Sequence, residues 1–550
     1  MPHRKGCQEP PPHSEGVSTI VRALAGLLLL VLVAAATPVV AYAPHVVRFN
    51  YDEDDVPNLN PFLGTAAPLT PLTELTGAEF VRFDADNKPV PDLVTTIPSK
   101  ANGGISADGR TITWHLRHGL KWSDGSPLTS ADVVYTYRVA TDNDNNITVR
   151  SPWERLSSVA APDPNTVIFH FKKPYALFLA DFFSTVSPSC VLPQHVLGPG
   201  TKINQAPFNG LPIGAGPFRY TAFNRGDSIV MEVNPYYWHG RAKLERIVYK
   251  PITDEDTVFT QLQTGELDLW ELINGVLAQR VRTLPGKAVT STQSGIVSGV
   301  YFNTRRPVVS DRRVREALRY ATDQTTIVNK IAFGNGLMQR SVIGSNYADY
   351  LSMPLIPYDP KRAASMLDAD GWKLGADKVR HKNGAALAIE LAIPGGYAPS
   401  ANLANILQQD WGAIGVRVNT HVWPDSTFFA PASTGGIVYG GKFDAALLSQ
   451  GGTLYAYFST NFTCASIPPN GFNVVRYCDP KVDALTAQYE QNFDAAERKR
   501  IAAQIQRVID AEVPAIVLYQ RLAVSAYDNR LRNFHPTAFT AYGDPLQLDI

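Results

Sequence analysis

The sequence predicts a fold in which helices and short strands are mixed throughout, of the α/β or α+β class. Short runs of alternating apolar and polar residues indicate strands, and apolar residues three and four positions apart indicate helices. Of the 550 residues, 45% are hydrophobic and 18% are charged, so the chain can form substantial cores and is not disordered. At roughly 150 residues per domain, this length allows two to four domains.

The predicted strands are short and are often bounded by turns. Residues 46–51 alternate in this way before an acidic turn at 52–55. Residues 111–116 follow a turn at Asp108 and Gly109, and residues 166–171 and 229–233 have strand-like patterns.

The longest helical patterns lie in the second half of the chain. One helix begins at Asp311, a second covers about 401–411, and a third follows Asp494 and continues to about 509. A further helix in the first half is capped by Ser130 or Thr129.

The charge balance excludes one class of partner. Lys and Arg number 50, Asp and Glu also number 50, and no long run has a single sign. Nucleic acid binding needs concentrated basic side chains, so we expect no nucleic acid partner. A large secreted binding protein or enzyme fits this composition.

The first 43 residues have the order of a secretory signal. Basic residues at positions 4, 5 and 22 precede an apolar run over 23–36, and small residues end at Ala43. Cleavage after Ala36 or Ala41 is an alternative, as is an uncleaved N-terminal anchor. We expect the mature chain in the periplasm or otherwise outside the cytoplasm.

The cysteines agree with an oxidising compartment. Cys7 lies in the leader, and Cys464 and Cys478 are separated by 14 positions across a turn-rich stretch. This spacing favours a disulfide between them, with two unpaired thiols as the alternative. Cys190 is then a buried free thiol.

Signatures of catalysis and metal binding are missing from the sequence. It has no Gly-x-Ser-x-Gly, His-Glu-x-x-His or Cys-x-x-Cys motif. His115 and His118 lack a nearby third metal ligand. We therefore expect no enzymatic activity, no cofactor and no bound metal.

One segment resembles a known family. Residues 114–133 (WHLRHGLKWSDGSPLTSADV) are similar to the signature of bacterial extracellular solute-binding proteins of family 5, the oligopeptide-, dipeptide- and nickel-binding components of ABC importers. Further family-like segments follow in the right order, at 212–218, 234–238, 262–268, 302–304, 311–318 and 359–372.

The resemblance implies a bilobal periplasmic-binding-protein fold of the class II type with an extra inserted subdomain. Lobe I would comprise 44–79, 210–300 and 516–550, the insert 80–209, and lobe II 301–515. The chain would cross between the lobes near 300–302 and 516–519. Such lobes close around a ligand by hinge motion.

The same resemblance implies a function. A monomer would capture a peptide or peptide-like solute between its lobes and deliver it to the membrane permease of an ABC importer. An oligosaccharide or another non-peptide solute is an alternative ligand, and a secreted hydrolase using cleft carboxylates is an alternative class.

This sequence departs from the family pattern at one ligand-binding position. In peptide-binding relatives, a carboxylate in the second lobe meets the ligand's α-amino group, and Thr453 occupies that position here. A hydroxyl does not supply the charge-assisted pairing of a carboxylate. Either the ligand lacks a free amino terminus, or another acid, such as Asp425, replaces the missing one.

Candidate ligand-binding residues come from both predicted lobes. Those of lobe II offer an aromatic face or neutral hydrogen-bonding groups, and those of lobe I follow or end the first strand. They are Trp423, Gln450, Thr453 and Tyr455 in lobe II, and Asn50 and Asp52 in lobe I.

Overall fold

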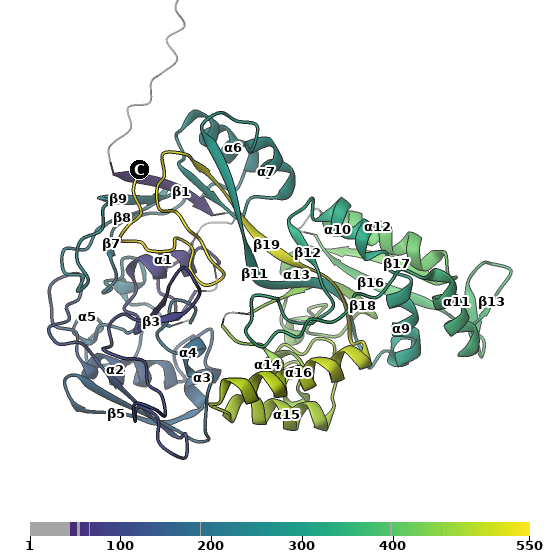
Figure 1. Ribbon diagram of the computed structural model, residues 1–550, viewed down its shortest axis with the longest axis horizontal. Coiled ribbons are helices and arrows are strands. Elements are labelled where there is room, and N and C mark those ends of the chain that lie inside the picture. The colour runs from purple at the N-terminus through teal and green to yellow at the C-terminus, as the bar shows by residue number, and fades with distance from the viewer. Residues whose placement is uncertain (1–44, 52–55, 65, 188, 396–398, 453) are drawn as a thin grey trace, which may run out of the picture. The chain divides into compact units, whose positions relative to one another are not determined.

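One mixed β-sheet extends through much of the protein (Figure 1), a computed structural model that describes residues 45–51, 56–64, 66–187, 189–395, 399–452 and 454–550. Its strand order is β17-β16-β18-β11-β19-β10-β1-β9-β8-β7, and β12 pairs with β19. The strands are β1 (Val46–Tyr51), β7 (Phe218–Asn224), β8 (Ser228–Val233), β9 (Arg246–Tyr249), β10 (Leu269–Glu271), β11 (Lys287–Phe302), β12 (Gly336–Met338), β16 (Ala388–Pro394), β17 (Arg417–Trp423), β18 (Ala445–Gln450) and β19 (Ala515–Asp528).

Two long antiparallel strands, β11 and β19, connect the two halves of this sheet. Their ladder starts at the pair of Lys287 and Asp528, near the strand β10, and ends beside β18. The crossings expected at 300–302 and 516–519 lie within these strands. We call the part from β10 to β7 the first half and the part from β18 to β17 the second half.

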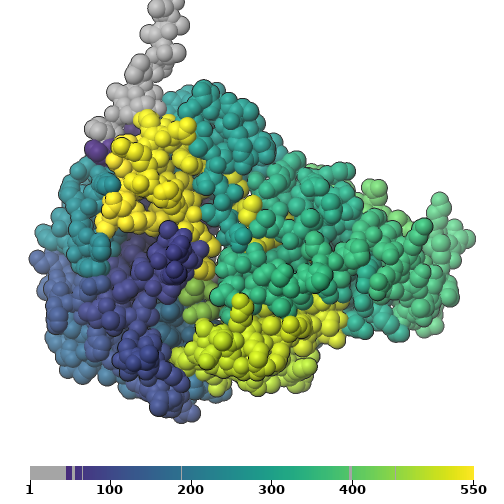
Figure 2. All heavy atoms as spheres, in the orientation of Figure 1, coloured from purple at the N-terminus to yellow at the C-terminus, as the bar shows by residue number. Residues whose placement is uncertain are grey.

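The first half packs its sheet against helices and the C-terminal residues. Its helices are α1 (Leu69–Thr76), α6 (Glu255–Thr264) and α7 (Gly275–Val281). The alternation of β1 buries Val47 and Phe49, which share an apolar cluster with Leu72 of α1 and Tyr542. Figure 2 shows the C-terminal residues in yellow beside the dark purple residues that follow β1.

Residues 80–209 form a separate small sheet with several helices. The sheet order is β4-β6-β5, and β2 pairs with β3. The backbone amide of Ala131 donates to Thr129 Oγ1 at the start of α2, so Thr129 is the cap. The elements are β2 (Val81–Phe83), β3 (Pro89–Pro91), β4 (Thr111–His115), α2 (Ser130–Thr141), α3 (Ser151–Glu154), β5 (Leu156–Asp163), β6 (Thr166–Phe171), α4 (Phe178–Asp181) and α5 (Gln194–Leu197).

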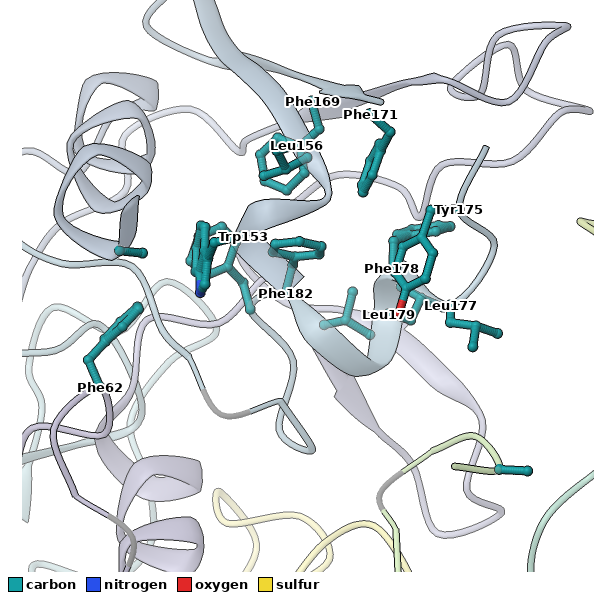
Figure 3. Packing of buried hydrophobic residues seen from close by; sticks show 14 of the residues in the cluster. Phe62, Trp153, Leu156, Phe169, Phe171, Tyr175, Leu177, Phe178, Leu179 and Phe182 are labelled. Carbon is teal, nitrogen blue, oxygen red and sulfur yellow. The ribbon is translucent and has the colours of Figure 1, made fainter. Parts of the chain in front are cut away.

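Aromatic rings fill the core of this 80–209 segment (Figure 3). The Trp153 ring lies 5.9 Å from Phe62 and 5.2 Å from Phe182, the second contact edge-on. Phe171 lies 5.7 Å from Tyr175. Such ring pairs are more favourable than their buried area alone implies, and this packing holds the chain around Tyr175 in place.

The second half contains most of the long helices. Asp311 caps α9 and Asp494 caps α16, each by accepting a backbone N–H through its carboxylate, which confirms the two predicted helix starts. Helices and remaining strands are α8 (Pro307–Ser310), α9 (Arg312–Tyr320), α10 (Gln324–Ile331), α11 (Pro360–Ala369), α12 (Pro399–Gly412), α13 (Asp425–Phe428), α14 (Phe458–Asn461), α15 (Pro480–Gln491), α16 (Ala495–Glu512), β13 (Lys373–Leu374), β14 (Arg380–Lys382) and β15 (Ala385–Ala386).

The apolar core of the 80–209 segment continues into the second half. Its cluster includes Leu485 and Tyr489 of α15 and Ile501 and Ile505 of α16. This segment was expected to be an insert of lobe I, and here it also packs against the helices of the second half.

A disulfide joins Cys464 to Cys478, with a sulfur–sulfur distance of 2.06 Å, and Cys190 is a buried free thiol. The expected leader lies outside the described residues. Within the described ranges, none of the helices has the length and apolar character needed to cross a membrane.

Candidate functional site

A cavity of about 860 Å³ lies where the two halves and the 80–209 segment meet. Its walls come from α1, the ends of β1 and β10, β11, and three stretches within 149–187, 448–461 and 536–541. We call it the central cavity. Its volume is in the range of sites for small molecules.

The ends of several strands face the central cavity. Tyr51 and Glu271 are the last residues of the parallel strands β1 and β10 and pair in register, and Gln450 ends β18, which runs parallel to β16. All three line the cavity. In open sheets, ligands bind outside the carboxyl ends of parallel strands, and this position matches that rule.

A bulge in β11 adds backbone to the same site. The ladder between β11 and β19 shifts register between Gln293 and Val297, and residues 294–296 line the cavity. The bulge is held by side chains rather than by ladder bonds: the Ser294 hydroxyl donates to the Arg521 carbonyl at 2.8 Å, and the Gln520 amide donates to the Ser294 carbonyl at 2.6 Å.

Two buried carboxyl groups lie in the wall formed by the first half. Glu74 of α1 is 2% exposed and Glu271 of β10 is 5% exposed. Burial raises the pKa of Glu74 to about 7 and the pKa of Glu271 to about 8. The negative charge of Glu74 raises the pKa of Glu271 further. The Ala541 amide donates to Glu74 Oε2 at 2.7 Å and opposes the rise there. Near neutral pH both groups therefore tend to hold a proton.

A charged group from the 80–209 segment meets the second half at the opposite wall. Arg155 donates through both terminal nitrogens to Glu490 of α15, at 3.1 and 3.2 Å. Its guanidinium lies 4.5 Å from the centre of the Tyr175 ring, and the Tyr175 hydroxyl donates to Asp181. Burial raises the pKa of Asp181 to about 6. The Arg155–Glu490 pair thus links two parts of the chain across the edge of the cavity.

Aromatic and neutral polar groups line the wall from the second half. Tyr439, Tyr455 and Phe472 contribute rings, and Ser449 and Gln450 contribute a hydroxyl and an amide. Flat rings give apolar contact area, and the neutral groups can donate and accept hydrogen bonds. This wall suits a ligand with many uncharged polar groups.

The structure brings Gln450 and Tyr455 to the central cavity, as the sequence analysis expected of ligand-binding residues. Thr453 and Asp52 lie outside the described residues. Asp425 is exposed at the start of α13 and is not part of the cavity wall.

Two other expected residues lie away from the cavity. Asn50 is fully buried, and its amide donates to the carbonyls of Lys250 at 2.7 Å and Ile252 at 3.0 Å, so it anchors the chain after β9. Trp423 ends β17, the outermost strand of the second half, and packs against the apolar cluster that includes Phe428. Neither side chain lines the central cavity, because Asn50 points into the core and Trp423 sits at the sheet edge.

Sequence reasoning missed the acids and the arginine of the cavity. Glu74 and Glu271 lie within apolar stretches, where a charged residue is uncommon and marks either a paired group or a site. That signal was available. No local pattern pointed to Arg155 and Glu490, which are 335 positions apart.

The described residues include no group of three or more His, Cys, Asp or Glu side chains placed to hold a metal ion.

The two halves are joined by a pair of long strands, and a cavity lies between them at the strand ends. This arrangement defines a two-lobed ligand-binding protein. Residues 88–466 match the model of the bacterial extracellular solute-binding proteins, family 5. The chain belongs to this family, as the segment at 114–133 indicated. The bilobal α/β architecture that the resemblance implied is likewise confirmed.

Curated relatives cover most of the chain. Protein XP55 of Streptomyces lividans is 29% identical over 450 residues, which are 78% of this chain and 76% of that protein. The oligopeptide-binding protein AppA of Bacillus subtilis is 27% identical over 427 residues, 76% of each chain. Among solved structures, NikA from Brucella suis in complex with Fe(III)-EDTA aligns with a TM-score of 0.80 at 22% identity, covering 92% of this chain and 99% of that one.

Proposed function

We propose that this protein captures a peptide or peptide-like solute in the central cavity and delivers it to the membrane permease of an ABC importer. It acts outside the cytoplasm after export by its N-terminal leader, as a monomer and without catalysing a reaction. Family membership supports the role as a solute-binding component. The observation that carries the proposal is the position of the cavity, at the strand ends between the two halves.

The cavity chemistry supports a peptide-like ligand. A peptide presents a carbonyl and an N–H at each residue, and these need neutral partners of both kinds when buried. Ser449 and Gln450 offer such partners, while Tyr439 and Tyr455 offer apolar area for side chains. The relative AppA is named for oligopeptide binding.

Ligand that co-purifies with the mature protein tests this proposal. The protein is denatured after gel filtration, and the released small molecules are identified by mass spectrometry. Ser449→Trp, at an exposed position of the cavity wall, should remove the bound ligand, whereas the matched control Ser365→Trp on exposed α11 should retain it. Release of peptides supports the proposal. Release of an oligosaccharide as the sole ligand, or hydrolysis of added peptides, would contradict it.

A further inference from the structure

Each of the two buried carboxyl groups of the central cavity has one oxygen without a hydrogen-bond partner among the described residues. Oε1 of Glu74 and Oε1 of Glu271 accept no hydrogen bond from the described residues, although both side chains are more than nine-tenths buried. An unpaired buried oxygen is costly, and native proteins rarely keep one without a use. Both residues belong to the cavity wall, so a ligand bound in the cavity lies next to them.

The surrounding charges do not neutralise this pair. Arg82 donates to the Glu74 carbonyl at 2.8 Å, but its charge is directed to Asp92 at 2.8 Å and to Glu79 at 3.9 Å. The charge of Arg82 opposes the rise in the pKa of Glu74, but Arg82 is also paired with Glu79 and Asp92.

The remaining titratable neighbours of the pair are phenols. The Tyr542 side chain lies beside Glu271 and favours its ionised form, and Tyr51 lies close to Tyr542. Burial among acids raises the pKa of the Tyr542 hydroxyl further above its ordinary range, so it stays neutral. A phenol can donate one hydrogen bond, but it supplies no positive charge.

We propose that Glu271, with Glu74 beside it, binds a positively charged group of the ligand, an ammonium or a guanidinium. This inference rests on the proposed function and names the chemistry of its ligand. It also supplies an acid, here in the first half, for the role that the sequence analysis left open between a ligand without a free amino terminus and another acid. A hydrogen bond between a carboxylate and a cationic N–H donor is about twice as strong as a hydrogen bond between two neutral groups.

Binding of a cation at this site requires a proton to leave. Burial holds the Glu271 carboxyl protonated at pH 7. When the cation enters, the carboxyl O–H bond breaks, its proton passes to the buffer, and the carboxylate then accepts hydrogen bonds from a ligand that keeps all its protons. Affinity for a guanidinium therefore rises from pH 6 to pH 8.5, while affinity for an uncharged ligand stays nearly constant.

Calorimetric titration of the mature protein with two matched peptide pairs tests the proposal. The first pair is tetra-alanine with a free and with an acetylated amino terminus. The second is N-acetyl-Ala-Arg-Ala-amide and the same peptide with citrulline, which keeps the shape of arginine without its charge. We expect one charged member to bind roughly 10- to 100-fold tighter than its neutral counterpart. The pair that shows this preference tells whether the amino terminus or a side chain is recognised.

Proton release and one variant complete the test. Titrations in buffers of different ionisation enthalpy should show about one proton released at pH 7 with the charged peptide and none with the neutral one. Glu271→Gln should abolish both the preference and the release, whereas Glu266→Gln, at an exposed site before β10, should leave them unchanged. If Glu271→Gln does not fold, the inference is tested by measuring proton release with the unaltered protein alone.

Four outcomes contradict the inference. Equal affinity for charged and neutral members, or a preference that survives in Glu271→Gln, would overturn it and leave the proposed function standing. Absence of proton release would do the same. Failure of all four peptides to bind would instead overturn the proposed function, and this inference with it.

Discussion

Gly299 lies in β11 where the backbone of β19 leaves no room for a side chain, and replacing it should weaken the connection between the halves. It is buried opposite Val517. A Cβ atom at this position would lie 2.4 Å from the carbonyl oxygen of Ile516 and 3.1 Å from the Val517 Cα. Both are backbone atoms, so no side chain can rotate away. The strands would have to separate by about 0.6–1 Å to restore ordinary contact.

The cost of Gly299→Ala follows from this displacement. Overpacking a close contact costs about 1–3 kcal/mol, and weakening one ladder hydrogen bond adds about 1 kcal/mol. We therefore expect the free energy of unfolding to fall by about 2–4 kcal/mol, measured by urea unfolding followed by circular dichroism. The control is Gly412→Ala at the exposed end of α12, where a Cβ meets no atom within 4 Å. Alanine there should be neutral or stabilising by up to about 1 kcal/mol. Equal midpoints for Gly299→Ala and the unaltered protein would refute this account of the crossing.

Three further predictions concern stability and closure. Reduction with dithiothreitol should lower the free energy of unfolding, measured by urea unfolding, by about 3 kcal/mol, because the Cys464–Cys478 bond closes a loop of 14 positions in the unfolded chain. A variant with both cysteines replaced by alanine should not respond to the reductant, and a response there would contradict the assigned disulfide. Since the folded pKa of Glu271 is raised from 4.5 to about 8, its neutral form stabilises the fold fully below pH 4.5 and this contribution is lost as pH rises through 8. Glu271→Gln should thus match the unaltered protein near pH 4.5 and exceed it by on the order of 4 kcal/mol at pH 8.5 in the same unfolding assay, and a constant difference across pH would count against the buried carboxyl. Arg155 and Glu490 should show a coupling of about 1 kcal/mol in ligand affinity in a double-mutant cycle of Arg155→Met and Glu490→Gln, discounted for the 36% exposure of the arginine. A coupling below about 0.3 kcal/mol would show that the pair does not support ligand binding by linking the 80–209 segment to the second half.

Features set by neighbouring residues could be predicted from the sequence. A helix cap depends on one side chain and the next three backbone amides, so Asp311 and Asp494 were identified correctly. Strand alternation depends on period two, and residues 229–233 do form a strand. Gln450 was proposed as a ligand-binding residue from the family resemblance and not from a local pattern.

Features set by distant parts of the chain could not be predicted in this way. Glu74 and Glu271 are almost 200 positions apart, and their shared cavity wall exists only after β1 and β10 pair. Trp423 ends a strand as Gln450 does, but the order β17-β16-β18 puts its strand at the sheet edge. Strand order is not contained in the local pattern of either segment, so the sequence could not separate these two candidates.

A crystal structure of the mature protein with its co-purified ligand, once mass spectrometry has identified it, tests the central claim most directly. We predict electron density for the ligand in the central cavity, with a positively charged nitrogen within hydrogen-bonding distance of the Glu271 carboxylate and with contacts to Gln450 and Tyr455. Ligand density elsewhere on the protein, with the central cavity empty, would contradict the account.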